Sequence, residues 1–341
     1  MVRRISLTLA IVGCFLSGLT AVRAETFTFR SEYVLGTSFE MIVSTRDQAT
    51  AARAHAMALG EIERLEQILS TWQRETEISN LNMSDGGVVS QELFDVLSLC
   101  EGFLTSTKNA LSCRIGDVVD TWREAAKTGV SPLPVAMNKR AADISAADVA
   151  LDPQNTSVGR PSSVSFIVDG LAKGWIIDQT VEKIVSSLPS IHGVMINIGG
   201  DIRAYGDATI PQYRIGIAEK GGASETLSEV IRVQNAAIAS SGNGARDLMA
   251  GEATYSHIIS PRTGMPQSKM SRATVVAPDA MTADALATAF MVMGVGEALE
   301  YANTREGVEA VLTTKGGARF ASNGWSDLLV PIDQIISNRE V

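Results

Sequence analysis

A carboxylate and a hydroxyl stand four residues apart near the start of an apolar helical segment. In TADALATAFMVMG, Thr282 is a predicted N-cap, Asp284 falls in the first turn and Thr288 follows one turn later. The i, i+4 spacing places both side chains on one helix face, and hard oxygen ligands of this kind bind Mg²⁺ together with phosphate oxygens. The alternative is structural, since Asp is favourable near a helix N-terminus and Thr288 could bond to its own turn.

A histidine precedes a turn in YSHIISPRTGMP, residues 255–266. The segment combines the imidazole of His257 with Ser and Thr hydroxyls and with the turn formers proline and glycine. Such a combination could build one wall of a ligand site, or it could end a strand. Both interpretations stay open on the residues alone.

Glycines interrupt three further segments that carry polar groups, which are VDGLAKGW, VMINIGGDIRAYG and AIASSGN. Glycine lets a backbone approach a bulky ligand closely, and a lysine near a helix start can neutralise a phosphate. A tight turn or a solvated lysine would explain the same residues. The positions concerned are Gly170, Lys173, Asn197, Gly199, Gly200 and Ser241.

The elements that must position these residues follow from hydrophobic periodicity. Helical spacing predicts helices over 47–72, 91–110 and 282–302, and another that follows an apolar run within 164–188. Strands are predicted as a pair over 26–45, within 194–206, 213–219, 229–242 and 256–261, and as a closing hairpin over 308–325. Prolines predict loops with short strands over 129–163. Interleaved strands and helices predict an α/β (α+β) fold.

Composition narrows the class of protein. The 341-residue chain is 45% hydrophobic and 20% charged, as in globular proteins, with a formal net charge of −9. This acidic balance argues against a large nucleic-acid surface. With three histidines and no CxxC motif, a zinc or multi-histidine site is not expected. Cys100 and Cys113 could pair in an oxidising compartment or could be buried thiols.

The N-terminus has the layout of a secretory signal. Arg3 and Arg4 precede an apolar run that ends in small residues before Ala24. We therefore expect residues 1–24 to be removed and the protein to be exported to the periplasm. Two variants of this prediction are a lipid anchor to the inner membrane through Cys14 and a twin-arginine signal.

The order of these segments resembles that of the ApbE-type FAD:protein FMN transferases. The matching segments are GT near the start, LSTWQRETEISNLN, GLAKGWIIDQ, INIGGDI, SSG, SHIISPRTG and ADALATAFMVMG, the last two being the most specific. The resemblance implies a single T-fold-related domain over 25–341, with a central mixed sheet and flanking helices. It also implies transfer of FMN from FAD onto a Thr (or Ser) hydroxyl of an exported or membrane redox protein, with release of AMP.

Site residues carry over position by position. The resemblance makes Asp284, Thr288 and the carbonyl of Gly170 ligands of an Mg²⁺ that bridges the FAD diphosphate. His257 and Asp284 are the expected catalytic residues. His257 could assist proton removal from the hydroxyl, or it could instead be a hydrogen-bonding residue that holds FAD. The expected FAD-binding residues are Trp72, Lys173, Asn197, Gly199, Gly200, Ser241, His257, Pro261 and Thr263, with Arg262 shaping the adjoining turn.

Several positions depart from the family pattern. Met-Gly-Thr near the N-terminus becomes Leu35-Gly36-Thr37, and the FDPT segment becomes Leu111-Ser112-Cys113-Arg114. Ile167 and Ser260 each replace an Asp, although Asp169 lies two residues after Ile167. Arg114 could direct its charge toward the phosphates or could be a surface residue.

These departures leave two alternatives to the transferase. One is an FAD diphosphatase on the same scaffold, in which water rather than a protein hydroxyl reaches the phosphorus. The other is a non-catalytic periplasmic flavin-binding accessory protein, in which the substituted loops have abolished turnover.

Overall fold

The computed structural model describes residues 24–221, 224–244, 247–250 and 253–331. The predicted signal segment, apart from Ala24, and the predicted lipidation site Cys14 therefore lie outside the described residues. Within the described residues, no helix is long and apolar enough to cross a membrane.

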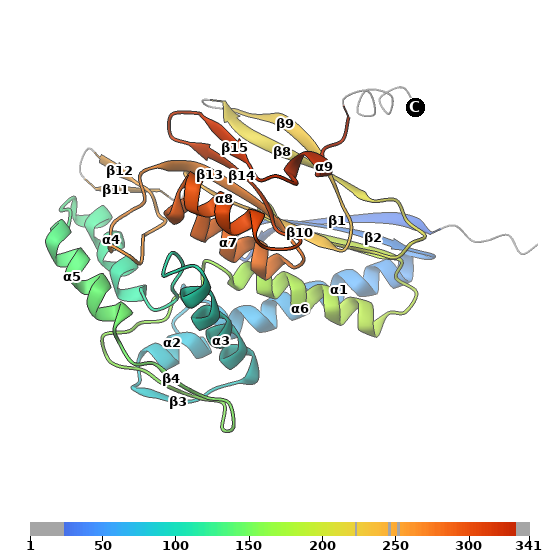
Figure 1. The fold of residues 1–341 in the computed structure, drawn as a ribbon. Coiled ribbons are helices and arrows are strands. Elements are labelled where there is room, and N and C mark those ends of the chain that lie inside the picture. Colours follow the sequence, from blue (N-terminus) through green and yellow to red (C-terminus); the bar gives the residue numbers. More distant parts are fainter. Residues whose placement is uncertain (1–23, 222–223, 245–246, 251–252, 332–341) are drawn as a thin grey trace, which may run out of the picture.

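An eight-stranded sheet forms the centre of the molecule (Figure 1). Its strands follow the order β1 (Glu25–Val34), β2 (Thr37–Thr45), β6 (Gly193–Ile198), β7 (Asp201–Gly206), β10 (Ala236–Gly242), β13 (Met270–Ala277), β14 (Glu309–Thr314) and β15 (Arg319–Ala321). Every neighbouring pair is antiparallel. The predicted α/β (α+β) fold is confirmed, but the sheet is antiparallel rather than mixed, because tight hairpins join β1 to β2, β6 to β7 and β14 to β15.

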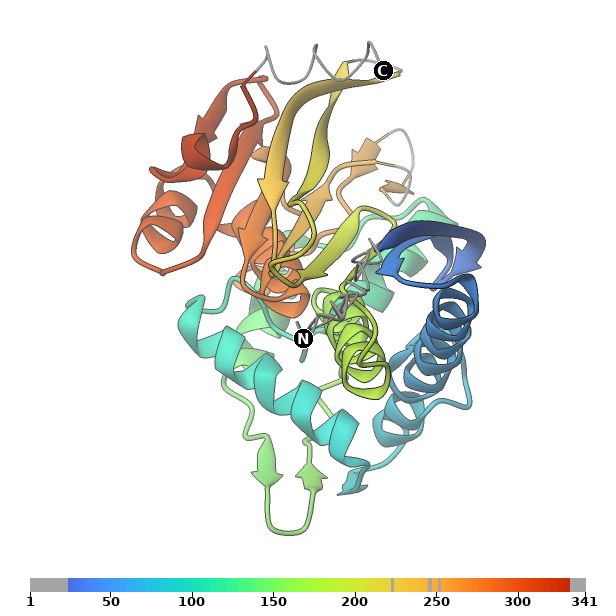
Figure 2. The same ribbon diagram turned by 90° about the vertical axis from the view of Figure 1, so that its right-hand side faces the viewer.

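Three helices cover one face of this sheet. They are α1 (Gln48–Leu69), α6 (Ala172–Ser187) and α7 (Ala280–Met293), and α7 packs on β10 and β13. Figure 2 shows the blue α1 beside the yellow-green α6. Apolar strand residues such as Met41 and Ile196 form the main core with Phe290 of α7. Burying the helices against the sheet in this way makes α6 and α7 rigid supports for side chains at their N-termini.

The other face of the sheet carries a smaller layer. The hairpin β8 (Tyr213–Gly221) and β9 (Ser224–Val233) contributes Ile215 and Ile231 to a second core with Trp325 of α9 (Trp325–Leu328). The ribbon in Figure 1 shows this hairpin lying on the side of the sheet away from α1 and α6.

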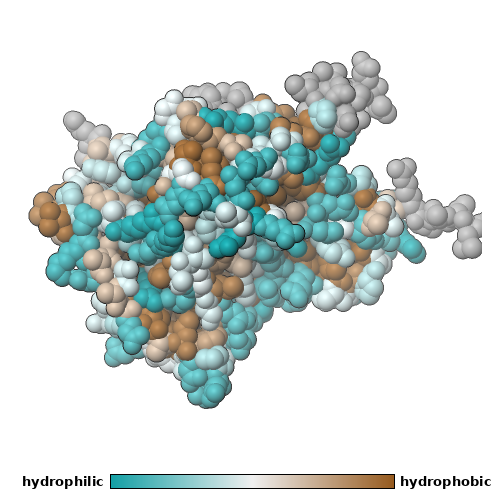
Figure 3. Space-filling model, viewed as in Figure 1, coloured by the Kyte–Doolittle hydropathy of each residue, from teal (hydrophilic) through white to brown (hydrophobic). Residues whose placement is uncertain are grey.

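Four of the remaining helices gather beside one end of α6 and α7 (Figure 1). They are α2 (Glu77–Asn82), α3 (Gln91–Ser106), α4 (Gly116–Thr128) and α5 (Pro134–Ser145), accompanied by the small sheet of β3 (Gly86–Val88), β5 (Ser157–Gly159) and β4 (Ala150–Asp152), whereas α8 (Val295–Asn303) packs on α7 and β14. A short hairpin, β11 (Leu248–Ala250) and β12 (Ala253–Tyr255), contacts α4. Apolar residues gather at the left edge in Figure 3, where α4 and α5 lie.

Four local predictions need correction. The stretch 129–163 contains α5, because Pro134 stands at the helix start, where its missing N–H costs nothing. The predicted helix 282–302 is two helices, α7 and α8 (Val295–Asn303), separated at Gly294 with φ +77°. Residues 256–261 form no strand, and the run 229–242 is divided between β9 and β10.

Candidate active site

A cleft of about 630 Å³ opens where the helical group meets α6, α7 and the sheet. Most of the predicted site residues line it, namely Trp72, Gly170, Lys173, Ser241, His257, Pro261, Asp284 and Thr288. They come from segments more than 200 residues apart in the sequence, so the fold itself brings them together. In the stretch 255–266, Tyr255 ends β12, and His257, Ile258 and Pro261 then line the cleft, so both features predicted for this stretch are present.

The start of α7 is fixed by two carboxylates. Asp279 caps the helix by accepting a hydrogen bond from Thr282 N at 2.7 Å, so the predicted cap at Thr282 is wrong and Asp284 lies in the second turn. Asp178 of α6 accepts bonds from Ala280 N at 2.9 Å and Met281 N at 2.8 Å. Burial raises the pKa of Asp178 to about 6. These contacts hold the next turn of α7 rigidly at the cleft.

Oxygen atoms converge on the floor of the cleft. Asp284 is 6% exposed, and its Oδ2 accepts a hydrogen bond from Gly174 N at 3.1 Å. Thr288 Oγ1 lies 3.1 Å from Ser241 Oγ of β10. Gly170 lies against Thr288, since a Cβ built on the glycine would come 3.4 Å from Thr288 Cγ2. The predicted i, i+4 pair thus reaches the cleft beside the predicted glycine.

This donor set suits a hard divalent cation. A carboxylate, a hydroxyl and a backbone carbonyl are oxygen ligands of the type that Mg²⁺ accepts, usually with substrate phosphates completing its shell. The described part of the chain has no group of three or more His, Cys, Asp or Glu residues placed to hold a metal. A cation at Asp284 would therefore depend on neutral oxygens and on the phosphates of a bound ligand.

A buried ion pair stands beside these oxygens. Lys173 Nζ at the start of α6 lies 2.6 Å from Asp201 Oδ2 of β7, and Asp201 is 1% exposed. Lys173 is therefore held at the cleft rather than solvated. Sequence reasoning missed Asp201, although it directly follows the glycine pair that had been singled out. The carboxylate fixes the lysine and leaves the local charge near neutral.

The mouth of the cleft carries an exposed aromatic platform. Trp72 is 70% exposed, and the guanidinium of Arg123 lies 4.2 Å from its ring centroid. Arg123 also lies 3.7 Å from Asp169, which accepts a hydrogen bond from Thr71 Oγ1 at 3.4 Å. Arg123 and Asp169 both line the cleft. No sequence motif pointed to Arg123, because only the tertiary fold brings α4 over residue 72.

His257 lies beside a carboxylate that sequence reasoning also missed. Its Nδ1 lies 3.0 Å from Asp247 Oδ1, and its backbone N–H donates to the same oxygen at 3.2 Å. His257 lines the cleft together with Ile258 and Pro261. A histidine paired in this way is a candidate general base.

Four predicted ligand-binding residues lie outside the lining of the cleft. Asn197 Oδ1 accepts a hydrogen bond from Gly200 N at 2.9 Å and so stabilises the β6–β7 turn. Gly199 and Gly200 have φ of +59° and +98°, which suits glycine. Thr263 Oγ1 accepts a bond from Met265 N at 3.3 Å inside its own turn. The visible contacts of these residues are those of turn formation, and their binding of a ligand stays a prediction.

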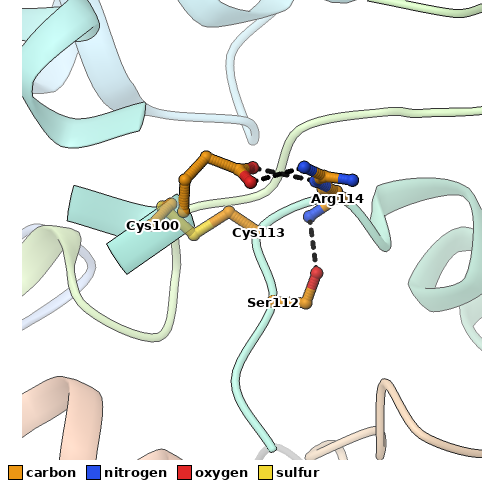
Figure 4. Close-up of a disulfide and its surroundings, with 5 residues drawn as sticks. Cys100, Ser112, Cys113 and Arg114 are labelled. Carbon is orange, nitrogen blue, oxygen red and sulfur yellow. Dashed lines mark hydrogen bonds and ion pairs between the residues drawn. A yellow bond between two sulfur atoms is a disulfide. The ribbon is translucent and has the colours of Figure 1, made fainter. Parts of the chain in front are cut away.

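The loop 110–116 lines the cleft and is cross-linked to α3. Cys100 and Cys113 form a disulfide with a Cα–Cα distance of 5.8 Å, which settles the pairing that the sequence left open (Figure 4). Arg114 is buried, pairs through two nitrogens with Glu101 and donates to Ala147 O at 2.8 Å. It lies neither among the residues that line the cleft nor on the surface, so both expectations for Arg114 are wrong.

The turn 257–266 is held from behind by another arginine. Arg262 forms a two-pronged pair with Glu297 of α8 at 2.6 and 2.7 Å and donates to the carbonyl of Lys108 at 3.0 Å. The Glu297 hydrogen bond raises the pKa of Arg262. Ser260, where the family has Asp, accepts from Gly264 N at 2.8 Å through its carbonyl. The turn thus closes through backbone contacts.

Comparison with known proteins agrees with this architecture. The ApbE family model matches residues 35–312. A FAD:protein FMN transferase from Vibrio cholerae is 29% identical over 277 residues, which are 79% of this chain and 82% of the relative. One from Treponema pallidum is 26% identical over 328 residues, covering 89% of each chain.

Solved structures share the fold. The ApbE protein of Thermotoga maritima superposes with a TM-score of 0.79 at 22% identity, covering 90% of this chain and 100% of that one. The flavin transferase ApbE from Vibrio cholerae gives a TM-score of 0.72 at 24% identity with the same coverage.

Proposed function

The chain belongs to the ApbE family, and we propose that it is a Mg²⁺-dependent FAD:protein FMN transferase. It transfers FMN from FAD to a Thr (or Ser) hydroxyl of an exported or membrane redox protein and releases AMP. The transferase class rests on the relatives that share most of its length. The cation, the acceptor hydroxyl and the released AMP are what the resemblance to this family implies, and the groups that line the cleft support them.

One observation carries the proposal. Asp284, Thr288 and Gly170 line a single cleft together with Lys173 and His257. Cleaving a diphosphate requires charge neutralisation on the phosphate oxygens and a group that takes the nucleophile's proton. Mg²⁺ bound at Asp284 would neutralise that charge and orient the diphosphate.

The remaining steps belong to the chain's own residues. The acceptor hydroxyl oxygen forms a bond to the FMN phosphorus, and the bond from that phosphorus to the oxygen shared with AMP breaks. His257 takes the hydroxyl proton, and AMP departs with the electron pair of the broken bond. Lys173, oriented by Asp201, donates a hydrogen bond to a phosphate oxygen, while Trp72 offers a face on which a flavin or adenine ring stacks.

The disulfide supports the predicted export. Cysteines that pair within one chain are typical of oxidising compartments such as the periplasm. The Cys100–Cys113 bond therefore favours a periplasmic location for this chain. Attachment through Cys14 would place the same domain at the inner membrane, close to a membrane acceptor.

A labelling assay tests the proposal. Purified protein, FAD, Mg²⁺ and a Thr-containing acceptor should give a fluorescent acceptor band on a denaturing gel, together with one AMP per flavin transferred. Asp284→Ala should lower the rate by at least about 100-fold, because the cation loses its carboxylate. An acceptor band without flavin fluorescence, together with release of FMN and AMP, would instead identify a diphosphatase. FAD that stays bound without release of AMP would identify a passive binder.

Thr288→Val and Thr282→Val form a matched pair for the same assay. Both exchange a hydroxyl for a methyl group on α7, but only Thr288 lines the cleft. We expect Thr288→Val to lower the rate roughly tenfold or more and to raise the Mg²⁺ concentration needed for half-maximal activity. Thr282→Val should behave like the wild type. Equal effects of the two changes would mean that the hydroxyl at 288 is no ligand.

A further inference from the structure

We propose that Asp247 is a positioning residue that fixes the tautomer of His257. This inference rests on the proposed transferase function, in which His257 takes a proton from the acceptor hydroxyl. Asp247 lies directly before β11, ten residues ahead of His257 in the sequence, and the fold returns the two side chains to contact.

The contacts around Asp247 define its orientation. Oδ1 faces both the ring Nδ1 of His257, at 3.0 Å, and the backbone N–H of His257, at 3.2 Å. Oδ2 accepts a hydrogen bond from Gly244 N at 3.1 Å. Both oxygens therefore accept backbone N–H groups, which fixes the direction in which the carboxylate faces His257.

The burial of the pair makes this contact strong. The side chains of His257 and Asp247 are 20% and 10% exposed. A carboxylate beside Nδ1 requires that nitrogen to carry a hydrogen, so in the neutral ring the lone pair resides on Nε2. Nε2 is then the ring nitrogen that accepts the acceptor hydroxyl's proton as its oxygen bonds to phosphorus and AMP leaves. Without the carboxylate, the imidazole reverts to the Nε2–H tautomer that free histidine prefers and cannot accept at Nε2.

The chain contains a matched control for this pair. His192 Nδ1 lies 2.9 Å from Asp207 Oδ2, again with the ring partly buried, but neither residue lines the cleft. The two pairs have nearly the same Nδ1–carboxylate distance, although Asp207 is more exposed, and they differ in their position relative to the proposed reaction. Asp207→Asn should therefore disturb a histidine tautomer without affecting transfer.

Nitrogen NMR on protein labelled at histidine reads the tautomers directly. The chain has three histidines, and His257→Ala assigns the signal of interest. The spectra are recorded at about pH 8.5, where an ordinary imidazole is neutral, and we expect the Nδ1–H form for His257 in the wild type. Asp247→Ala and Asp247→Asn should shift it toward Nε2–H, whereas Asp207→Asn should shift only His192. An unchanged His257 tautomer in both Asp247 variants would overturn the inference.

Kinetics supply the second readout. Asp247→Ala should lower kcat at least about tenfold, while the Kd for FAD, measured by fluorescence quenching of exposed Trp72, changes less than about threefold. Equal kcat values in wild type, Asp247→Ala and Asp247→Asn would also refute the role. Absence of transfer in the wild type would contradict the proposed function instead, and the NMR experiment would still decide the tautomer.

Discussion

The two walls of the cleft are built from similar parts but are fixed differently. We call residues 110–116 the loop wall and residues 257–266 the turn wall. Each has an arginine that points away from the cleft to a glutamate on a helix, Arg114 in the loop wall and Arg262 in the turn wall. Only the loop wall is also joined covalently to its supporting helix, through Cys113.

The turn wall depends instead on buried packing. Trp122 of α4 is 1% exposed, donates from Nε1 to Gly264 O at 2.8 Å and packs on Tyr255 with ring centroids 5.1 Å apart. Gly264 has φ +66°, and a Cβ there would come 2.6 Å from Met137 O. The turn is thus fixed by a glycine-dependent fit against α4 and α5.

The difference follows the family pattern. In the turn wall, only Ser260 departs from the pattern that the resemblance implies, whereas in the loop wall Ser112 and Arg114 stand where it implies Asp and Thr. Where those polar residues are lost, this chain holds the wall with a disulfide and a buried ion pair. Retained motif residues and a covalent link are two ways to keep a cleft wall in place.

Among the changes proposed here, removing Trp122 should lower the free energy of unfolding most. It tests the turn wall alone, because Trp122 contacts Gly264 of that wall. Trp122→Ala deletes a fully buried ring and a hydrogen bond, so we expect a loss of about 4 kcal/mol in the free energy of unfolding, measured by urea denaturation. Trp122→Phe retains most of the ring volume and should cost about 1 to 2 kcal/mol. Equal costs for the two variants would show that packing at Trp122 contributes little.

Removing the Cys100–Cys113 disulfide tests how the loop wall is held in place. Cys100→Ala with Cys113→Ala frees a link between residues 13 apart in sequence, which should lower the free energy of unfolding by about 3 kcal/mol. We also expect weaker FAD binding, because Cys113 lines the cleft. A reductant should move the wild type toward the double variant and leave the variant unchanged. If the reduced protein bound FAD as tightly as the oxidised one, the link would be irrelevant to the cleft.

The sequence predicted best what depends on neighbours along the chain. Asp284 and Thr288 reach the cleft together because helical spacing alone puts them on one face. The hairpin pairs and the amphipathic helix α1 follow equally from local periodicity. Errors at Thr282 and Gly294 are also local: Asp279 competes successfully for the cap, and a glycine with positive φ divides the helix.

Long-range partners could not be predicted in the same way. Asp201 meets Lys173, and Arg123 meets Trp72, only after α6 and α4 have packed against the rest of the fold. Arg114 looked like a free charge in the sequence, because nothing local shows that Glu101 lies beside it in the fold. Such pairings depend on tertiary distances, for which spacing in the sequence gives no rule.

The two arginine–glutamate pairs should differ in strength. Arg114 is 10% exposed at its side chain and Arg262 is 30% exposed. Glu101→Gln leaves a buried guanidinium poorly compensated and should cost about 2 kcal/mol, whereas Glu297→Gln should cost less than about 1 kcal/mol. Denaturation of both variants in one buffer compares them. A larger loss of stability in Glu297→Gln than in Glu101→Gln would show that the pair in the turn wall is the stronger one.

The stabilisation of the turn wall by the Arg262–Glu297 pair should depend on pH. The hydrogen bond from Arg262 lowers the pKa of Glu297 below its ordinary value of 4.5. A carboxyl whose folded pKa is lowered stabilises the protein above its unfolded pKa, and that contribution disappears as the pH falls through the folded value. The stability difference between wild type and Glu297→Gln should therefore be full at neutral pH and shrink below pH 4.5. Denaturation midpoints measured from neutral to acidic pH test this, and a difference that stays constant would mean that the charge on Glu297 does not stabilise the turn wall.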